Sequence, residues 1–133
     1  MEIKNIVTRN FKLSEVVHSP LEDLPLELYP VACIALGYIQ ALRDTLKVPI
    51  VITSGYRSPS RNKAIGGSAN SMHMWRFDKD GKPIFALDII SPGMSASKLY
   101  EAIHPIVNGE VYLHKNLQFV HLAPYGADEN WVL

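Results

Sequence analysis

Two short apolar runs are each interrupted by one ionisable residue. Residues 85–90 read FALDII and contain Asp88, and residues 119–122 read FVHL and contain His121. Short apolar runs of this kind are typical of buried strands. A carboxylate or an imidazole that is buried without a partner costs free energy. The chain must therefore fold so that Asp88 and His121 meet a partner, and a metal ion or an opposite charge would serve.

The remaining pattern mixes helices and strands. Val31, Ala35, Tyr38, Ile39, Leu42 and Leu46 recur at helical spacing after Pro30, which predicts a long helix. Shorter helices are predicted over residues 15–18 and 60–65 and after Ser95. Strands are predicted over residues 48–53, 75–77, 84–90, 110–113 and 119–122, the last two antiparallel. This mixture predicts the α+β class.

Length, charge and cysteine content narrow the class of protein. The 133 residues suit one domain, residues 1–133. Thirteen basic and thirteen acidic residues cancel, so we expect no nucleic-acid partner. The uncharged stretch 28–42 is too short for a membrane span, and the N-terminus shows no signal peptide. We therefore expect synthesis in the cytoplasm. The single cysteine excludes a metal cage built on cysteines.

Two further residues could carry chemistry. Arg57 leaves a predicted strand through Ser54-Gly55-Tyr56, where its guanidinium could bind a carboxylate, or could form a local salt bridge. His73 ends a run of small residues, and a lone histidine is more often structural than a ligand. Two imidazoles and one carboxylate are nevertheless a ligand set typical of catalytic zinc. We predict that His73, Asp88 and His121 bind one Zn²⁺ per chain, with a fourth position for water.

Taken in order, several segments between Phe11 and Ala123 resemble the M15 family of zinc peptidases, the D-alanyl-D-alanine carboxypeptidase and L-alanyl-D-glutamate endopeptidase group. Each segment is weak alone, but the ordered set is specific. The segments are Asn10-Phe11-Lys12-Leu13-Ser14-Glu15, Ala41-Leu42-Arg43-Asp44, Ile52-Thr53-Ser54-Gly55-Tyr56-Arg57-Ser58-Pro59, Asn62, Ile65-Gly66-Gly67-Ser68, Ser71, His73, Ala86-Leu87-Asp88-Ile89 and Phe119-Val120-His121.

The resemblance implies a central antiparallel sheet with flanking helices, as in D-Ala-D-Ala carboxypeptidase and Hedgehog-like folds. It implies that His73, Asp88 and His121 bind zinc and that Arg57 contacts the substrate or the developing oxyanion. We expect Tyr56 and Ser71 to line the substrate groove. The implied substrate is the peptidoglycan stem peptide, cut by a monomer that reaches the cell wall once released or carried by a phage.

The chain departs from the family pattern at two places. In most members the aspartate follows the first histidine by seven positions, which here is Asp80, and we interpret residues 74–83 as an inserted hairpin that moves the ligand to Asp88. Acidic residues three before or two after the last histidine are replaced by Gln118 and Ala123. The acid–base candidates that remain are Glu110 and His114, and we favour His114.

The missing acid leaves other classes open. The chain could be a zinc-stabilised cell-wall-binding module that is catalytically weak or inactive. It could also be a phage structural protein that uses the fold as a scaffold, because a fold does not fix a function.

Overall fold

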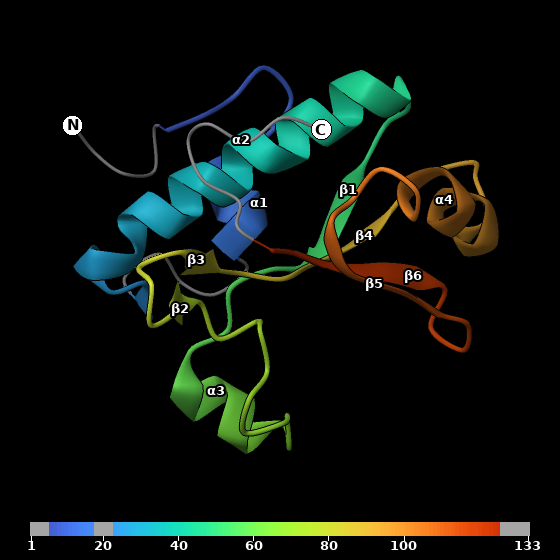
Figure 1. Cartoon of the computed structure of the whole chain (residues 1–133). Coiled ribbons are helices and arrows are strands. Elements are labelled where there is room, and N and C mark those ends of the chain that lie inside the picture. The colour runs from blue at the N-terminus through green and yellow to red at the C-terminus, as the bar shows by residue number, and fades with distance from the viewer. Residues whose placement is uncertain (1–5, 18–22, 126–133) are drawn as a thin grey trace.

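Four antiparallel strands form the central sheet (Figure 1). The computed structural model describes residues 6–17 and 23–125. The strands run in the order β1-β4-β6-β5, namely Val51–Ser54, Leu87–Ile90, Phe119–Pro124 and Gly109–His114. The α+β class and the antiparallel sheet are as predicted.

The register of this sheet aligns four residues in one row across all four strands. Asp88 pairs with His121, and His121 pairs with Tyr112. Ser54 pairs with Asp88 from the other side, after a shift in the β1–β4 register between Ile52 and Ser54. Side chains of directly paired residues lie on the same face of a sheet. Alternate residues point to the opposite face, where Leu87, Ile89, Val120 and Leu122 are fully buried in the core. The register therefore gives the sheet one apolar face and one face that carries ionisable groups.

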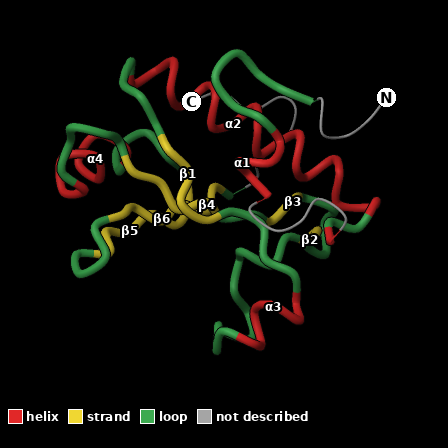
Figure 2. Tube along the Cα trace, turned by 180° about the vertical axis from the view of Figure 1, so that it is seen from behind, coloured by secondary structure: helices red, strands yellow, loops and turns green. Residues whose placement is uncertain are grey.

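The long predicted helix is α2, Tyr29–Leu46, with Pro30 in its first turn. Lys47 follows the last helical residue as its C-cap and adopts a left-handed conformation with φ 59°. In Figures 1 and 2, α2 lies at one end of the molecule and α3 (Pro59–Ala64) at the other, with the sheet between them. The other helices are α1 (Leu13–Val17), the 3₁₀ turn η3 (Leu26–Leu28) and α4 (Ala96–Ile103).

A serine N-cap precedes both α3 and α4, and the cap of α4 is Ser95, after which a helix was predicted. The Ser58 hydroxyl accepts from the Arg61 N–H at 3.2 Å, and the Ser95 hydroxyl accepts from the Lys98 N–H at 3.2 Å. Such caps satisfy a backbone donor that the helix leaves free. The short helix predicted over residues 15–18 is α1, and residue 18 lies outside the described residues.

The strand predicted over residues 84–90 is in fact two strands. β3 (Pro83–Ile84) pairs with β2 (Arg76–Phe77) in a separate hairpin, and β4 begins only at Leu87. Between them Phe85 turns into the core, where its ring packs edge-on against Trp75 at 6.3 Å. Trp75 and Phe85 thus anchor both ends of the predicted inserted hairpin.

The strand predicted over residues 48–53 is also shorter than expected and starts at Val51. Pro49 has no N–H to give to a sheet. Its carbonyl accepts from the Ser91 hydroxyl at 2.6 Å.

Within the described part of the chain, no helix is both long enough and apolar enough to cross a membrane.

Candidate metal centre

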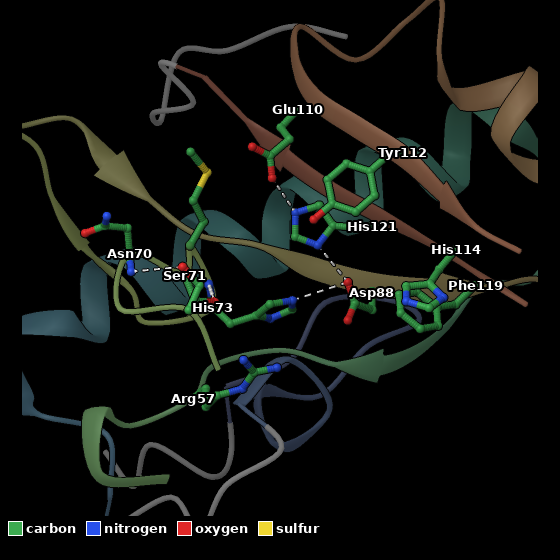
Figure 3. Close-up of a pocket in the computed structure, with 12 residues that line it drawn as sticks. Arg57, Asn70, Ser71, His73, Asp88, Glu110, Tyr112, His114, Phe119 and His121 are labelled. Atoms are coloured by element: carbon green, nitrogen blue, oxygen red, sulfur yellow. Dashed lines mark hydrogen bonds and ion pairs between the residues drawn. The ribbon is translucent and has the colours of Figure 1, made fainter. Parts of the chain in front are cut away.

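His73, Asp88 and His121 come together on the polar face of the sheet (Figure 3). Asp88 Oδ1 lies 3.2 Å from His73 Nε2 and 3.0 Å from His121 Nδ1. All three side chains are buried, with 10% or less of each exposed. One ligand atom from each residue lies within 4.8 Å of the others. Asp88 and His121 are brought together by the register, and His73 is supplied by the loop after α3.

The ring of His73 is fixed by the backbone of Gly55, whose carbonyl lies 2.8 Å from His73 Nδ1. A carbonyl can only accept, so Nδ1 carries the proton and Nε2 presents a lone pair. Gly55 can take this place because it has no side chain. A Cβ there would lie 1.7 Å from the carbonyl oxygen of Val16, which accepts from the Tyr56 N–H. The hydrogen bond to the end of α1 thereby fixes the position of the Gly55 carbonyl that holds His73.

The ring of His121 is held in a different way. Its Nε2 lies 2.8 Å from Glu110 Oε1, and the Tyr112 ring stacks on it at 4.4 Å and 13°. Each ring nitrogen of His121 therefore faces a carboxylate, Nε2 that of Glu110 and Nδ1 that of Asp88, and a neutral ring with its proton on Nε2 directs the lone pair of Nδ1 at Asp88.

Three electron-rich atoms therefore converge when both imidazoles are neutral. When the ring nitrogens that face Asp88 carry protons instead, burial raises the pKa of Asp88, but the hydrogen bonds from His121 and His73 and the positive charges of both rings outweigh burial and hold that pKa at about 2. The carboxylate is thus ionised at neutral pH. Two lone pairs aimed at a buried carboxylate are stable only if protons or a cation lie between them. Tetrahedral zinc bonds of about 2.0–2.2 Å separate ligand atoms by about 3.3 Å, so this donor set fits a metal ion.

The three residues open onto a cavity of about 380 Å³. The other residues that line it are Arg57, Ser68, Asn70, Ser71, Met72, Glu110, Tyr112, His114 and Phe119. Glu110, Tyr112 and His114 alternate along β5, so they share the face that carries His121. A cavity beside three convergent ligands leaves room for a substrate.

Arg57 lies across the ligand group from Glu110 (Figure 3). Its backbone N–H donates to the His73 carbonyl at 2.8 Å, and its Nη1 donates to Asn62 Oδ1 at 3.0 Å. Asn62 is 3% exposed and donates in turn to the Ser68 carbonyl. Gly67 permits this contact, because a Cβ there would lie 2.1 Å from Asn62 Oδ1. Asn62 therefore holds one edge of the guanidinium inside the cavity wall.

Of the other predicted site residues, Ser71 and His114 line the cavity and Tyr56 does not. Ser71 lines the cavity, and its hydroxyl accepts from the His73 N–H at 3.2 Å. His114 also lines it, with its ring stacked on Phe119 at 4.7 Å. Tyr56 does not line it. Its ring is 3% exposed and packs on Trp75 at 5.5 Å, so the expectation that Tyr56 lines the groove is wrong.

The departures from the family pattern have clear positions. Asp80 is exposed on the turn of the β2–β3 hairpin, where its N–H donates to Asp78 Oδ1. Gln118 is exposed on the β5–β6 turn with φ 56°, and its side chain donates to the Lys115 carbonyl. Ala123 is buried and pairs with Glu110 across the sheet. Neither Asp80 nor Gln118 is among the residues that line the cavity.

Sequence reasoning missed three features of the centre. Tyr112 could have been found from the sequence, because residues 110, 112 and 114 of one strand lie on the same face and residues 110 and 114 were already acid–base candidates. The role of the Gly55 carbonyl and the contact between Asn62 and Arg57 leave no local signal in the sequence, because both depend on segments packed together in space.

Comparison with known proteins found a match at the level of a family. No curated protein and no solved structure matched the chain at the significance we required. A family model did match, and it covers the sheet up to Ala123, the β2–β3 hairpin and every residue of the centre. Because residues 3–123 match the model described as Peptidase M15, the chain belongs to the Peptidase M15 family.

Proposed function

We propose that this chain is a zinc-dependent peptidase that cleaves peptidoglycan stem peptides. The observation that carries the proposal is the convergence of His73 Nε2, His121 Nδ1 and Asp88 Oδ1 beside an open cavity. Two imidazoles and one carboxylate are the protein ligands of a common class of catalytic zinc site, which keeps its fourth position open. Membership of a peptidase family supports the hydrolytic reaction.

Zinc held by these residues would polarise the scissile carbonyl and activate water near neutral pH. The chain supplies the rest of the chemistry. Arg57 has a planar guanidinium, which matches a carboxylate bidentately and can also steady a developing oxyanion. Stem peptides carry free carboxylates, so a fixed arginine in the wall favours substrates of this class. Ser71 adds a hydroxyl to the same wall.

We assign acid–base chemistry to His114. It lines the cavity at the end of β5, whereas Gln118 does not. An imidazole can take up and return a proton near neutral pH, as peptide hydrolysis requires.

One observation favours a second candidate. The acidic positions usual in the family hold Gln118, which is outside the cavity, and Ala123, which has no ionisable group. A zinc-stabilised binding module without turnover, including a phage structural module, would carry the same metal centre.

The test is release of muropeptides from purified peptidoglycan, and hydrolysis of a defined stem peptide, with and without a chelator. Cleavage that stops on chelation and returns with zinc supports the peptidase. The matched variants are His121→Ala, which removes a ligand, and His104→Ala, which removes an exposed histidine at the end of α4. Zinc-dependent binding without cleavage would select the module instead. Cleavage that persists in His121→Ala would overturn the zinc mechanism.

A further inference from the structure

Glu110 reaches His121 from the neighbouring strand. It lies opposite Ala123 in the β5–β6 ladder, and Ala123 is two residues from His121 on the same face. Diagonal neighbours in an antiparallel pair are within reach of a long side chain. Because Ala123 is small, the Glu110 side chain can lean across it, and Oε1 ends 2.8 Å from His121 Nε2. Figure 3 shows the carboxylate pointing down at the ring edge.

The two imidazoles of the centre are thus anchored by different kinds of acceptor. His73 donates to a neutral backbone carbonyl that the fold cannot easily move. His121 Nε2 faces the carboxylate of Glu110, whose side chain is 34% exposed at the cavity. Among the described residues that line the cavity, Asp88 and Glu110 are the carboxylates, and Asp88 already faces both histidines.

We propose that Glu110 is the positioning residue of His121: it selects the imidazole tautomer with the proton on Nε2 and so directs Nδ1 at the metal. Tyr112 stacks on the face of the same ring, which fixes its plane but leaves the position of the proton open. A carboxylate partner also increases the basicity of a histidine ligand, and loss of such a partner typically costs about 10–100-fold in metal affinity. The inference rests on the metal centre of the proposed function.

The first measurement reads the tautomer without any metal. Long-range ¹H–¹⁵N correlation spectra of the metal-free protein, recorded at mildly alkaline pH, distinguish a proton on Nε2 from one on Nδ1. We expect a proton on Nε2 of His121 in the wild type and a shift of the proton towards Nδ1, which faces the Asp88 carboxylate, in Glu110→Ala. Glu110→Gln keeps an acceptor oxygen without the charge, so it should keep the wild-type tautomer. Glu101→Gln, an exposed position on α4, is the matched control.

The second measurement is zinc affinity, by competition with a chromophoric chelator. We expect a loss of about 10–100-fold in Glu110→Ala, a smaller loss in Glu110→Gln and no change in Glu101→Gln. Near-ultraviolet circular dichroism identifies any variant that fails to fold. If Glu110→Ala does not fold, the zinc affinity of Glu110→Gln relative to Glu101→Gln tests the proposal.

The two proposals fail separately. If Glu110→Ala and Glu110→Gln both keep the wild-type tautomer and zinc affinity, the positioning role of Glu110 is overturned. If the tautomer changes in Glu110→Ala but the wild type binds no zinc, Glu110 does position His121 and the metal centre of the proposed function is overturned.

Discussion

Asp88 and His121 are direct cross-strand partners at the centre of the sheet, with Asp88 Oδ1 3.0 Å from His121 Nδ1. The contact is made by backbone register, so neither side chain has to travel to reach the other. The same Asp88 oxygen lies 3.2 Å from His73 Nε2. One carboxylate oxygen therefore connects a strand-borne histidine and a loop-borne histidine, and its replacement should disrupt both contacts.

The first prediction compares Asp88→Asn with Asp80→Asn. We expect Asp88→Asn to lose most of the bound zinc, because it removes the charge on which both histidines converge. Asp80→Asn should keep the wild-type zinc content, because Asp80 is exposed on the hairpin turn. Both substitutions make the same chemical change, and metal content per chain is read by elemental analysis. If Asp80→Asn lost the zinc and Asp88→Asn kept it, the assignment of the ligand would be wrong.

The second prediction concerns Gly55. A Cβ at this position would lie 1.7 Å from the Val16 carbonyl oxygen. Gly55→Ala must therefore push the end of α1 away from the segment that follows β1. We expect a loss of at least about 2 kcal/mol in the free energy of unfolding. Zinc affinity should also fall, because the Gly55 carbonyl holds His73 Nδ1.

Gly37→Ala is the matched control for Gly55→Ala. Gly37 lies inside α2, and a Cβ there would meet nothing within 4 Å. Alanine is the better helix former, so this variant should gain about 0.5–1 kcal/mol. Urea unfolding of both variants measures the difference. Equal stability of Gly55→Ala and wild type would mean that the close approach of α1 to Gly55 is absent.

Much of the fold could be predicted because local signals agree with the final structure. Helical spacing after Pro30 and the caps at Ser58 and Ser95 depend on neighbours in sequence, so they are visible in one chain. The polar residues inside apolar strands indicated a buried centre for the same reason. The hairpin inferred over residues 74–83 is also found, as the paired strands β2 and β3.

What could not be predicted depends on packing between distant segments. The apolar run at residues 84–90 is interrupted at Phe85, because its ring packs into the core. Nothing in the run itself indicates on which face of the sheet this ring will pack. Tyr56 lies next to Arg57 in sequence, but its ring packs on Trp75 while Arg57 lines the cavity. The β5–β6 register that brings Glu110 to His121 is also a property of the assembled sheet.

The third prediction is a pH dependence away from the metal centre. A hydrogen bond from Arg9 holds the pKa of Asp44 below its usual value. The pair therefore stabilises the fold above the unfolded-state pKa of about 3.9, and this contribution is lost as the pH falls through the lowered pKa. Asp44→Asn should have a slightly lower urea midpoint than wild type at pH 7, and the two midpoints should converge in acid.

The contribution of Asp44 is small because the pair is exposed. Added salt should reduce the difference at pH 7. Glu101→Gln, at an exposed position on α4, serves as the control. A difference between Asp44→Asn and wild type that stays the same from neutral pH to acid would contradict the assignment.

The last prediction concerns acid–base chemistry, which the proposed function assigns to His114. A positioned acid–base group typically contributes about 10²–10⁴-fold to a rate. We expect His114→Ala to cleave a defined stem peptide at least about tenfold more slowly than wild type while it keeps its zinc. His104→Ala should cleave at the wild-type rate. Gln118→Glu should give no gain, because residue 118 lies on a turn in a left-handed conformation and its side chain bonds to the Lys115 carbonyl, outside the cavity.

A wild-type rate in His114→Ala would remove His114 from the mechanism, and a faster Gln118→Glu would show that the turn can deliver an acid to the centre. No turnover in any of these proteins, with zinc bound, would favour the binding module.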